Sequence, residues 1–354
     1  MTSVTQQQSV RDAADAPEAL LTLRNVSKHF SVRTSANPFR RPRTLRAVDD
    51  VTLDVRASET FALVGESGSG KSTLGRLALR LIEPTSGDIM FDGEDITHVG
   101  SGRLRSLRRD MQVVFQDPLG SLNPRMKVGQ IIGEPLSVFE NARGSALKDR
   151  VEELMLAVGL DPSRASARPR ALSGGQRQRV GIARAIALNP KLILADEAVS
   201  ALDVSVQAQI ANLLVELRER LGLTYLFIGH GLPIVRQISQ RVGVMYMGRI
   251  VETGPIDDVF HAPAHPYTRA LMAASPVPDP SLKRDRIMLK GEPPSPLDLP
   301  SGCRFRTRCP LAEDVCAQQA PPRVEVSPGH VTECYFPERV PPLDDRPDKK
   351  ERIA

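Results

Sequence analysis

A glycine-rich stretch at residues 65–72 has the composition and spacing of a loop that binds phosphate. It reads GESGSGKS and matches the pattern G-x-x-x-x-G-K-[ST] at every position. Glycine lets such a loop wrap with its N–H groups pointing inward, and the start of the following helix adds positive potential. We expect Lys71 to reach the β- and γ-phosphates of a nucleoside triphosphate and Ser72 to bind Mg²⁺. The residues predicted to contact the nucleotide are Gly65, Ser67, Gly68, Ser69, Gly70, Lys71, Ser72 and Thr73.

An apolar stretch that ends in two carboxylates supplies groups that nucleotide hydrolysis requires. Residues 191–197 read KLILADE, the pattern of a buried strand followed by acidic side chains. Asp196 is placed to hold Mg²⁺, directly or through water, and Glu197 to orient or deprotonate the attacking water. Beside a phosphate-binding loop, this pair indicates hydrolysis and not merely a solvated turn.

A pair of glycines, apart from the loop at 65–72, precedes a long apolar-periodic helix and forms a second anion site. Residues 172–179 read LSGGQRQR, where Ser173 is a natural N-cap and the glycines free the N–H groups at the helix start. This stretch has no lysine of its own. Two half-sites for one triphosphate in one chain predict a head-to-tail dimer, in which each subunit completes the site of the other. The residues predicted to contribute are Ser173, Gly174, Gly175 and Gln176.

The motifs lie in a region, about residues 48–260, where short apolar runs alternate with helical periodicity. The runs are bounded by polar residues or glycine, which favours strands buried on both faces of a parallel sheet. The region is therefore predicted to be α/β with a mostly parallel core. The expected strands include 61–64, 192–195 and 225–228, and the expected helices include 72–82, 146–158, 175–188 and 206–221.

The overall composition is that of a globular protein, with 41% apolar and 25% charged residues among 354. A formal net charge of +5 does not by itself indicate nucleic acid, and the absence of tryptophan disfavours base stacking. No apolar run approaches the ~20 residues of a membrane span, and the polar N-terminus resembles no signal peptide, so we expect a cytosolic chain. Residues 1–18 are expected to be a disordered tail and residues 341–354 a second tail.

All four cysteines lie near the C-terminal end, and their clustering requires an explanation. A cytosolic location disfavours structural disulfides, whereas four thiolates can hold tetrahedral Zn²⁺ or an iron–sulfur cluster. The short C-x2–4-C spacing of zinc sites is absent, so the wider gaps and the proline after Cys309 favour a [4Fe–4S] cluster with a structural role. Zinc and free thiols remain alternatives. The candidate ligands are Cys303, Cys309, Cys316 and Cys334.

In their order and spacing, the motifs resemble those of the ATP-binding cassette (ABC) ATPases over about residues 21–260. The resemblance implies that Gln116 contacts Mg²⁺ and couples to a membrane partner, and that Asp203 shapes the dimer seam. It also implies that His230 contacts the γ-phosphate as the switch histidine, so that Glu197, His230 and Gln116 form the catalytic set. Such ATPases place an aromatic residue against adenine, for which Phe30 is the candidate.

The chain resembles more closely the ATPase subunits of bacterial oligopeptide and dipeptide importers. This resemblance rests on GESG at 65–68, FQDPLGSLNP at 115–124, MYMGR at 245–249, HPYTRAL at 265–271 and GCRF at 302–305. It implies a P-loop, ABC-type nucleotide-binding domain over residues 19–262, with a mostly parallel core sheet, an antiparallel β subdomain and a helical signature subdomain. It also implies a small Pro- and Cys-rich C-terminal domain of the oligopeptide-importer type over residues 263–340.

The function implied by this resemblance is ATP- and Mg²⁺-dependent energy coupling of solute import, with dipeptides or oligopeptides as cargo, at the cytoplasmic face of the cell membrane. The implied partners are two transmembrane permeases, a homologous ATPase subunit in preference to a second copy of this chain, and indirectly an extracytoplasmic solute-binding protein. No nucleic-acid partner is expected. Alternatives are import of nickel, oligosaccharide or another solute, and, more remotely, a soluble ABC ATPase of DNA repair or translation.

Four positions depart from the usual pattern of the family. Ala198 stands where proline is usual, and Gly229 and Gly231 flank His230 where serine and aspartate are usual. Ser58 stands where glycine commonly precedes Glu59. Because Glu197 and His230 are kept, hydrolysis is still expected.

Overall fold

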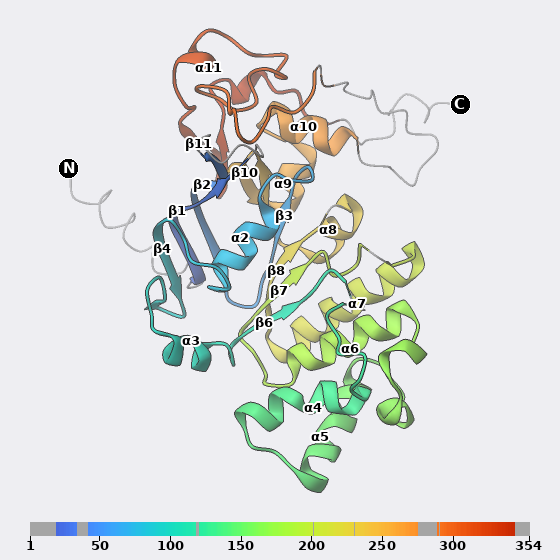
Figure 1. Ribbon diagram of the computed structural model, residues 1–354. Helices are drawn as coiled ribbons and strands as arrows, with labels where there is room; N and C mark the ends of the chain where they lie inside the picture. Colours follow the sequence, from blue (N-terminus) through green and yellow to red (C-terminus); the bar gives the residue numbers. More distant parts are fainter. Residues whose placement is uncertain are drawn as a thin grey trace, which may run out of the picture.

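The computed structural model describes residues 19–33, 42–117, 120–200, 202–229, 231–274, 289 and 291–343 (Figure 1). The predicted tail at residues 1–18, most of the tail at 341–354, and His230 lie outside the described residues. Among the residues that the structure does describe, no helix is both long and apolar enough to cross a membrane.

An eight-stranded sheet forms the centre of the molecule. Its strands are β3 (Thr60–Val64), β6 (Met111–Val114), β7 (Leu192–Asp196), β8 (Thr224–Ile228), β9 (Arg241–Tyr246), β10 (Arg249–Pro255), β11 (Arg323–Ser327) and β12 (His330–Glu333). They are ordered β11-β12-β10-β9-β3-β8-β7-β6, and the strands from β9 to β6 run parallel. Because layers pack on both faces, β3, β7 and β8 are buried at every position. The predicted parallel core is confirmed.

A second, antiparallel sheet packs over one face of the central sheet. It contains β1 (Ala19–Val32), β2 (Arg43–Arg56), β4 (Ser86–Phe91) and β5 (Glu94–Asp95) in the order β2-β1-β4-β5. Its apolar face shares one core with helix α2 (Lys71–Ala78) and with side chains of β3, β7 and β8. Figure 1 shows α2 between the two sheets, so the loop before α2 lies where both sheets can support it.

Helices cover the opposite face of the central sheet and extend beyond it. α6 (Gly174–Ile186), α7 (Val204–Leu221) and α8 (Leu232–Ile238) share a core with β3, β7 and β8. α4 (Val128–Phe139) and α5 (Gly144–Ala157) pack on each other and on α6, at the lower end of the view in Figure 1. The connecting elements are α3 (Ser101–Leu107) and the short 3-10 helices η1 (Pro162–Ser166) and η2 (Pro169–Ala171). The predicted helices are confirmed as α2, α5, α6 and α7.

The C-terminal segment is joined to the central sheet by a buried carboxylate. Its elements, from residue 263 onward, are α10 (Pro266–Ala273), α11 (Val315–Gln318) and η3 (Pro337–Arg339), together with β11 and β12, and α9 (Ile256–His261) precedes it. β12 pairs with β10, so the sheet continues into this segment. On β10, Glu252 accepts the N–H groups of Ala264 at 2.7 Å and His265 at 2.9 Å, and lies 2.7 Å from Nε2 of His330. These bonds fix the C-terminal segment against the edge of the core.

Candidate nucleotide-binding and hydrolysis site

The loop between β3 and α2 has a backbone that requires glycine. Gly65, Gly68 and Gly70 have φ angles of 149°, 76° and 107°, in the region that L side chains rarely adopt. A Cβ at Gly65 would lie 2.1 Å from the Met245 carbonyl oxygen, and one at Gly70 would lie 2.2 Å from the Ala47 carbonyl oxygen. The backbones of β9 and β2 therefore leave no room for a side chain at these two glycines, and the loop wraps tightly. Such a wrap, followed directly by the first turn of α2, can receive an anion.

Lys71 places an ammonium group inside this loop. Its Nζ donates hydrogen bonds to the carbonyl oxygens of Gly65 and Glu66, each at 2.9 Å, and lies 3.3 Å from Ser69 Oγ. Burial lowers the pKa of Lys71 to about 8, and the carboxylates of Glu197, Asp196 and Glu66 oppose that shift. The loop thus holds a buried cation suited to the charge of a nucleoside triphosphate.

A hydroxyl and a carboxylate meet at the base of the loop. Ser72 Oγ donates to Asp196 Oδ1 at 2.9 Å, which joins the first turn of α2 to the end of β7. Burial raises the pKa of Asp196, and the hydrogen bond from Ser72 opposes that rise. Mg²⁺ in nucleotide sites takes one or two protein oxygens together with phosphate oxygens and water. Ser72 and Asp196 fit that donor set.

Gln116 and Glu197 form a second pair beside the first. Gln116 follows β6, Glu197 follows β7, and Nε2 of the amide donates to Oε2 of the carboxylate at 2.6 Å. The Glu197 backbone has φ of 49° and its N–H donates to the Ile228 carbonyl at 2.9 Å, so β8 fixes the direction of the side chain. A carboxylate held in this way can orient a water molecule for attack on a phosphate.

One cavity of about 420 Å³ is lined by Lys71, Ser72 and Glu197 and by a candidate base-binding wall. Phe30 lies on this wall, 36% exposed, with Lys28 Nζ 5.2 Å from the centre of its ring. The structure therefore brings the predicted adenine residue to the same cavity as the phosphate-binding loop. The predicted residues that line the cavity are Phe30, Ser67, Gly68, Gly70, Lys71, Ser72, Thr73 and Glu197.

Sequence reasoning missed six residues that line this cavity: Leu45, Arg46, Ala47, Met247, Gly248 and Pro296. Pro296 comes from the C-terminal segment, more than two hundred positions beyond the loop, and belongs to no nucleotide motif. Its neighbour Asp298 forms an ion pair with Arg43 on β2, which holds this part of the chain near the cavity.

The second glycine motif lies at the start of α6. Ser173 Oγ accepts the N–H of Gln176 at 3.3 Å, and Gln176 Oε1 accepts the N–H of Ser173 at 3.0 Å, which forms a capping box. Gly174 and Gly175 form the first turn, and Asp203 is the N-cap residue of α7. Of the residues that the structure describes, none of these five lines the cavity that holds Lys71. Within one chain, the two predicted anion sites are separate.

The glycine at position 229 has a local structural reason. A Cβ there would lie 2.7 Å from Cε1 of Phe227 and 3.3 Å from Cγ2 of Val235, both of which are buried. A serine would collide with the Phe227 ring. By contrast, a Cβ at Gly231 would meet its nearest atom, Cδ1 of Ile234, at an ordinary 3.8 Å.

The four cysteines are free thiols in this structure. Cys316 and Cys334 are buried, and Cys303 and Cys309 are half-buried. Burial, together with the nearby thiols, raises the pKa of Cys309 to about 12 and of Cys334 to about 11. Within the described ranges, no group of three or more His, Cys, Asp or Glu side chains is arranged to hold a metal ion. The geometry therefore lends no support to the predicted cluster ligands.

The fold and the site together define a P-loop nucleotide-hydrolysing cassette. Comparison with protein families matches residues 48–200 to the ABC transporter family, and residues 251–316 to the oligopeptide/dipeptide transporter C-terminal region.

Similar proteins of known family extend over nearly the whole chain. A probable peptide ABC transporter ATP-binding protein of Sinorhizobium fredii is 51% identical over 90% of this chain and 90% of its own. The oligopeptide transport ATP-binding proteins AppF of Bacillus subtilis and OppF of Salmonella typhimurium are 49% and 48% identical, over 90% and 92% of this chain and 98% of theirs. This chain belongs to the family of ATP-binding proteins of oligopeptide/dipeptide ABC transporters.

A solved structure supports the fold at lower identity. The dimeric ATP-binding cassette MJ0796, in a post-hydrolysis state bound to ADP and Pi, is 30% identical with a TM-score of 0.60. The similarity covers 67% of this chain and 98% of that one. The chain is thus an ABC ATPase that acts on ATP with Mg²⁺.

Proposed function

We propose that this chain is the energy-coupling ATPase subunit of a membrane importer of dipeptides or oligopeptides. The observation that carries the proposal is one cavity lined by Lys71, Ser72 and Glu197, with Asp196 bonded to Ser72 and Gln116 bonded to Glu197. The chain also continues into an importer-type C-terminal region. In our assignment that region spans residues 263–340 and the nucleotide-binding domain spans residues 19–262. The AppF and OppF relatives are named as oligopeptide transport proteins.

The chemistry assigned to this site is ATP hydrolysis. The N–H groups of the loop and Lys71 bind the phosphates, and Ser72, Asp196 and Gln116 would hold Mg²⁺, which when bound would neutralise phosphate charge. Glu197 orients the attacking water and accepts its proton, while Gln116 holds the Glu197 carboxylate in place. Phe30 stacks on adenine. The assigned switch residue, His230, stays a prediction because it lies outside the described residues.

The complete site is assigned to a head-to-tail dimer. The capped start of α6, with Ser173, Gly174, Gly175 and Gln176, supplies the second anion site for the nucleotide held by the facing subunit, and Asp203 shapes the seam. This assignment is supported by the separation of the two half-sites within one chain. A homologous ATPase subunit is favoured over a second copy of this chain.

A partly apolar groove is the proposed contact for the transmembrane permeases. The groove, of about 570 Å³, is lined by residues of α3 and β6 and by Phe139 at the end of α4. Leu81 and Phe115 on its wall are 39% and 45% exposed. Since Phe115 directly precedes Gln116, a permease segment in the groove would move with the hydrolytic pair. Two permeases and, indirectly, an extracytoplasmic binding protein are the expected partners at the cytoplasmic face of the membrane.

Co-purification tests this function. A tagged chain is recovered from gently solubilised membranes of its native host, and its partners are identified by mass spectrometry. Two permeases, a second cassette subunit and a binding protein are expected, and the binding protein identifies peptide, nickel or oligosaccharide as the cargo. A set limited to ribosomal or DNA-repair proteins would contradict the transport function.

The [4Fe–4S] cluster of the four cysteines stays a separate hypothesis. Their clustering in the sequence supports it, and the arrangement of the free thiols does not. Anaerobically purified protein with stoichiometric iron and sulfide would establish the cluster, and protein without either would exclude it.

A further inference from the structure

The segment between Cys303 and Cys309 carries two buried arginines that reach out of the C-terminal segment toward the nucleotide site. The side chains of Arg304 and Arg308 are each 8% exposed. A buried guanidinium requires partners that compensate the loss of water. For both arginines, those partners lie on the cassette.

Arg308 contacts the phosphate-binding loop directly. Its Nη1 lies 3.3 Å and 3.2 Å from the two carboxylate oxygens of Glu66, and 3.5 Å from the hydroxyl of Tyr246 at the end of β9. Within the described part of the chain, its Nε has no hydrogen-bond acceptor. The contacts of this guanidinium are therefore directed at the loop and its support, and not at its own segment.

Glu66 is held a second time through its backbone. Its N–H donates to the hydroxyl of Tyr267, on α10, at 2.8 Å. The centre of the Tyr267 ring lies 4.6 Å from that of Tyr246 and 5.5 Å from that of Phe305. Phe305 is fully buried, and in the sequence it lies between the two arginines. One residue of the phosphate-binding loop is thus fixed at both its carboxylate and its N–H by the C-terminal segment.

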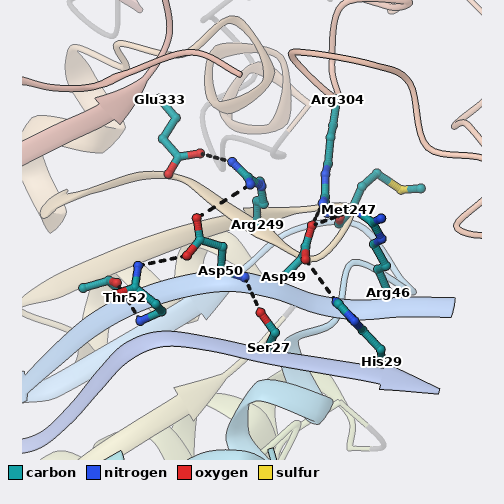
Figure 2. A network of polar contacts seen from close by, with 11 residues as sticks. Ser27, His29, Arg46, Asp49, Asp50, Thr52, Met247, Arg249, Arg304 and Glu333 are labelled. Atoms are coloured by element: carbon teal, nitrogen blue, oxygen red, sulfur yellow. Dashed lines mark hydrogen bonds and ion pairs between the residues drawn. The ribbon is translucent and has the colours of Figure 1, made fainter. Parts of the chain in front are cut away.

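Arg304 supports the other side of the loop through a turn. Figure 2 shows its guanidinium between Asp49 on β2 and Met247 in the β9–β10 turn, bonded to the Asp49 carboxylate and to the Met247 carbonyl. In the same turn, the N–H of Gly248 donates to the Ser69 carbonyl at 2.8 Å, and its own carbonyl accepts the Asp49 N–H at 2.9 Å. Arg304 therefore stabilises the β9–β10 turn, and that turn contacts the middle of the phosphate-binding loop.

We propose that Arg308 and Arg304 are positioning residues, through which the segment Cys303–Cys309 preorganises the phosphate-binding loop for ATP. A loop held at Glu66 and Ser69 before the nucleotide arrives loses less conformational freedom on binding, which raises affinity. The proposal rests on the ATPase function stated above. It predicts that the arginines act on ATP affinity, and that a bound nucleotide can still be hydrolysed when one of them is removed.

The test compares Arg308→Gln with Arg306→Gln in the purified full-length chain. Arg306 lies in the same segment but donates to the Ser301 carbonyl, at 2.9 Å, so its contact stays within the C-terminal region and does not reach the cassette. We expect Arg308→Gln to weaken binding of the fluorescent analogue mant-ATP about tenfold, as loss of one charge-assisted hydrogen bond would. Arg306→Gln should leave it unchanged. Arg308→Lys should recover part of the affinity because it retains the charge. KM for ATP should rise with little loss of kcat.

Two further variants separate positioning from simple folding. Tyr267→Phe removes only the hydroxyl that accepts the Glu66 N–H, and it should also weaken mant-ATP binding. In a Glu66→Gln background, Arg308→Gln should have little further effect, because both changes break the same contact. The proposal is wrong if Arg308→Gln and Tyr267→Phe bind mant-ATP as the wild type does. It is also wrong if the losses of mant-ATP affinity caused by Glu66→Gln and Arg308→Gln are additive. A wild-type chain that fails to bind mant-ATP would instead contradict the ATPase function.

Discussion

The amide of Gln116 donates a hydrogen bond to the carboxylate of Glu197 at 2.6 Å, across the ends of two adjacent parallel strands. The residues are eighty-one positions apart, and the sheet order β7-β6 brings them together. Because Gln116 also follows Phe115 on the wall of the proposed permease groove, this hydrogen bond joins the proposed mechanical contact to the proposed hydrolytic carboxylate.

The affinity for ATP is expected to fall as pH rises above about 8, the lowered pKa of buried Lys71 in the free chain. ATP binds the protonated ammonium, so above that pH each binding event requires uptake of a proton. The apparent dissociation constant should then rise by up to about tenfold per pH unit, and it should be insensitive to this group below pH 8. Titration of mant-ATP between pH 6.5 and 9.5 measures the effect. Lys71→Ala is the control: it should bind weakly, and its dissociation constant should not show this rise above pH 8.

Acid should destabilise the fold through His265, whose pKa burial lowers to about 3 from an ordinary value of about 6.5. The unfolded chain gains this proton below pH 6.5 and the folded chain does not, so stability falls as pH falls through that window. The loss is up to about 1.4 kcal/mol per pH unit.

The variant His265→Asn isolates this contribution. In the wild type, Nδ1 of His265 accepts the Tyr267 N–H at 3.0 Å, at the start of α10. The asparagine side chain retains an acceptor for the same N–H. Between pH 7.5 and pH 5, urea denaturation should show the wild type losing about 2 kcal/mol more than the variant. Parallel losses in both proteins would contradict the assignment.

Restoring the serine usual in the family at position 229 should destabilise this chain. The new Cβ would meet the buried Phe227 ring at 2.7 Å, and overpacking of this kind typically costs about 1–3 kcal/mol. Gly231→Ser is the matched control, since its Cβ meets its nearest atom at 3.8 Å. Chemical denaturation measures both. Equal stability of the two variants would show that Phe227 moves aside without cost.

The sequence was sufficient to predict the parts of the site that depend on local pattern. The loop at residues 65–72, the strand that ends in Asp196 and the cap at Ser173 each carry their spacing within one short stretch, and the structure places them on the expected elements. Their mutual arrangement follows from the parallel order of the buried strands.

Two features could not be predicted from local pattern. α4 contains Pro135, which removes an N–H and usually ends a helix, yet burial of Ile131, Ile132 and Leu136 against α5 and α6 stabilises it. Pro296 and Arg308 reach the nucleotide site only because the C-terminal segment folds back onto the cassette. Such contacts join distant parts of the chain, and no spacing in the sequence reveals them.

The central claim is that Glu197 activates water for ATP hydrolysis, and steady-state turnover of the assembled transporter tests it most directly. With Glu197→Gln in this chain, the amide cannot accept the proton of the attacking water, so ATP turnover at this site should fall about 10²-fold or more while mant-ATP binding is retained. Turnover equal to that of the wild type, with binding intact, would remove Glu197 from this role and contradict the account.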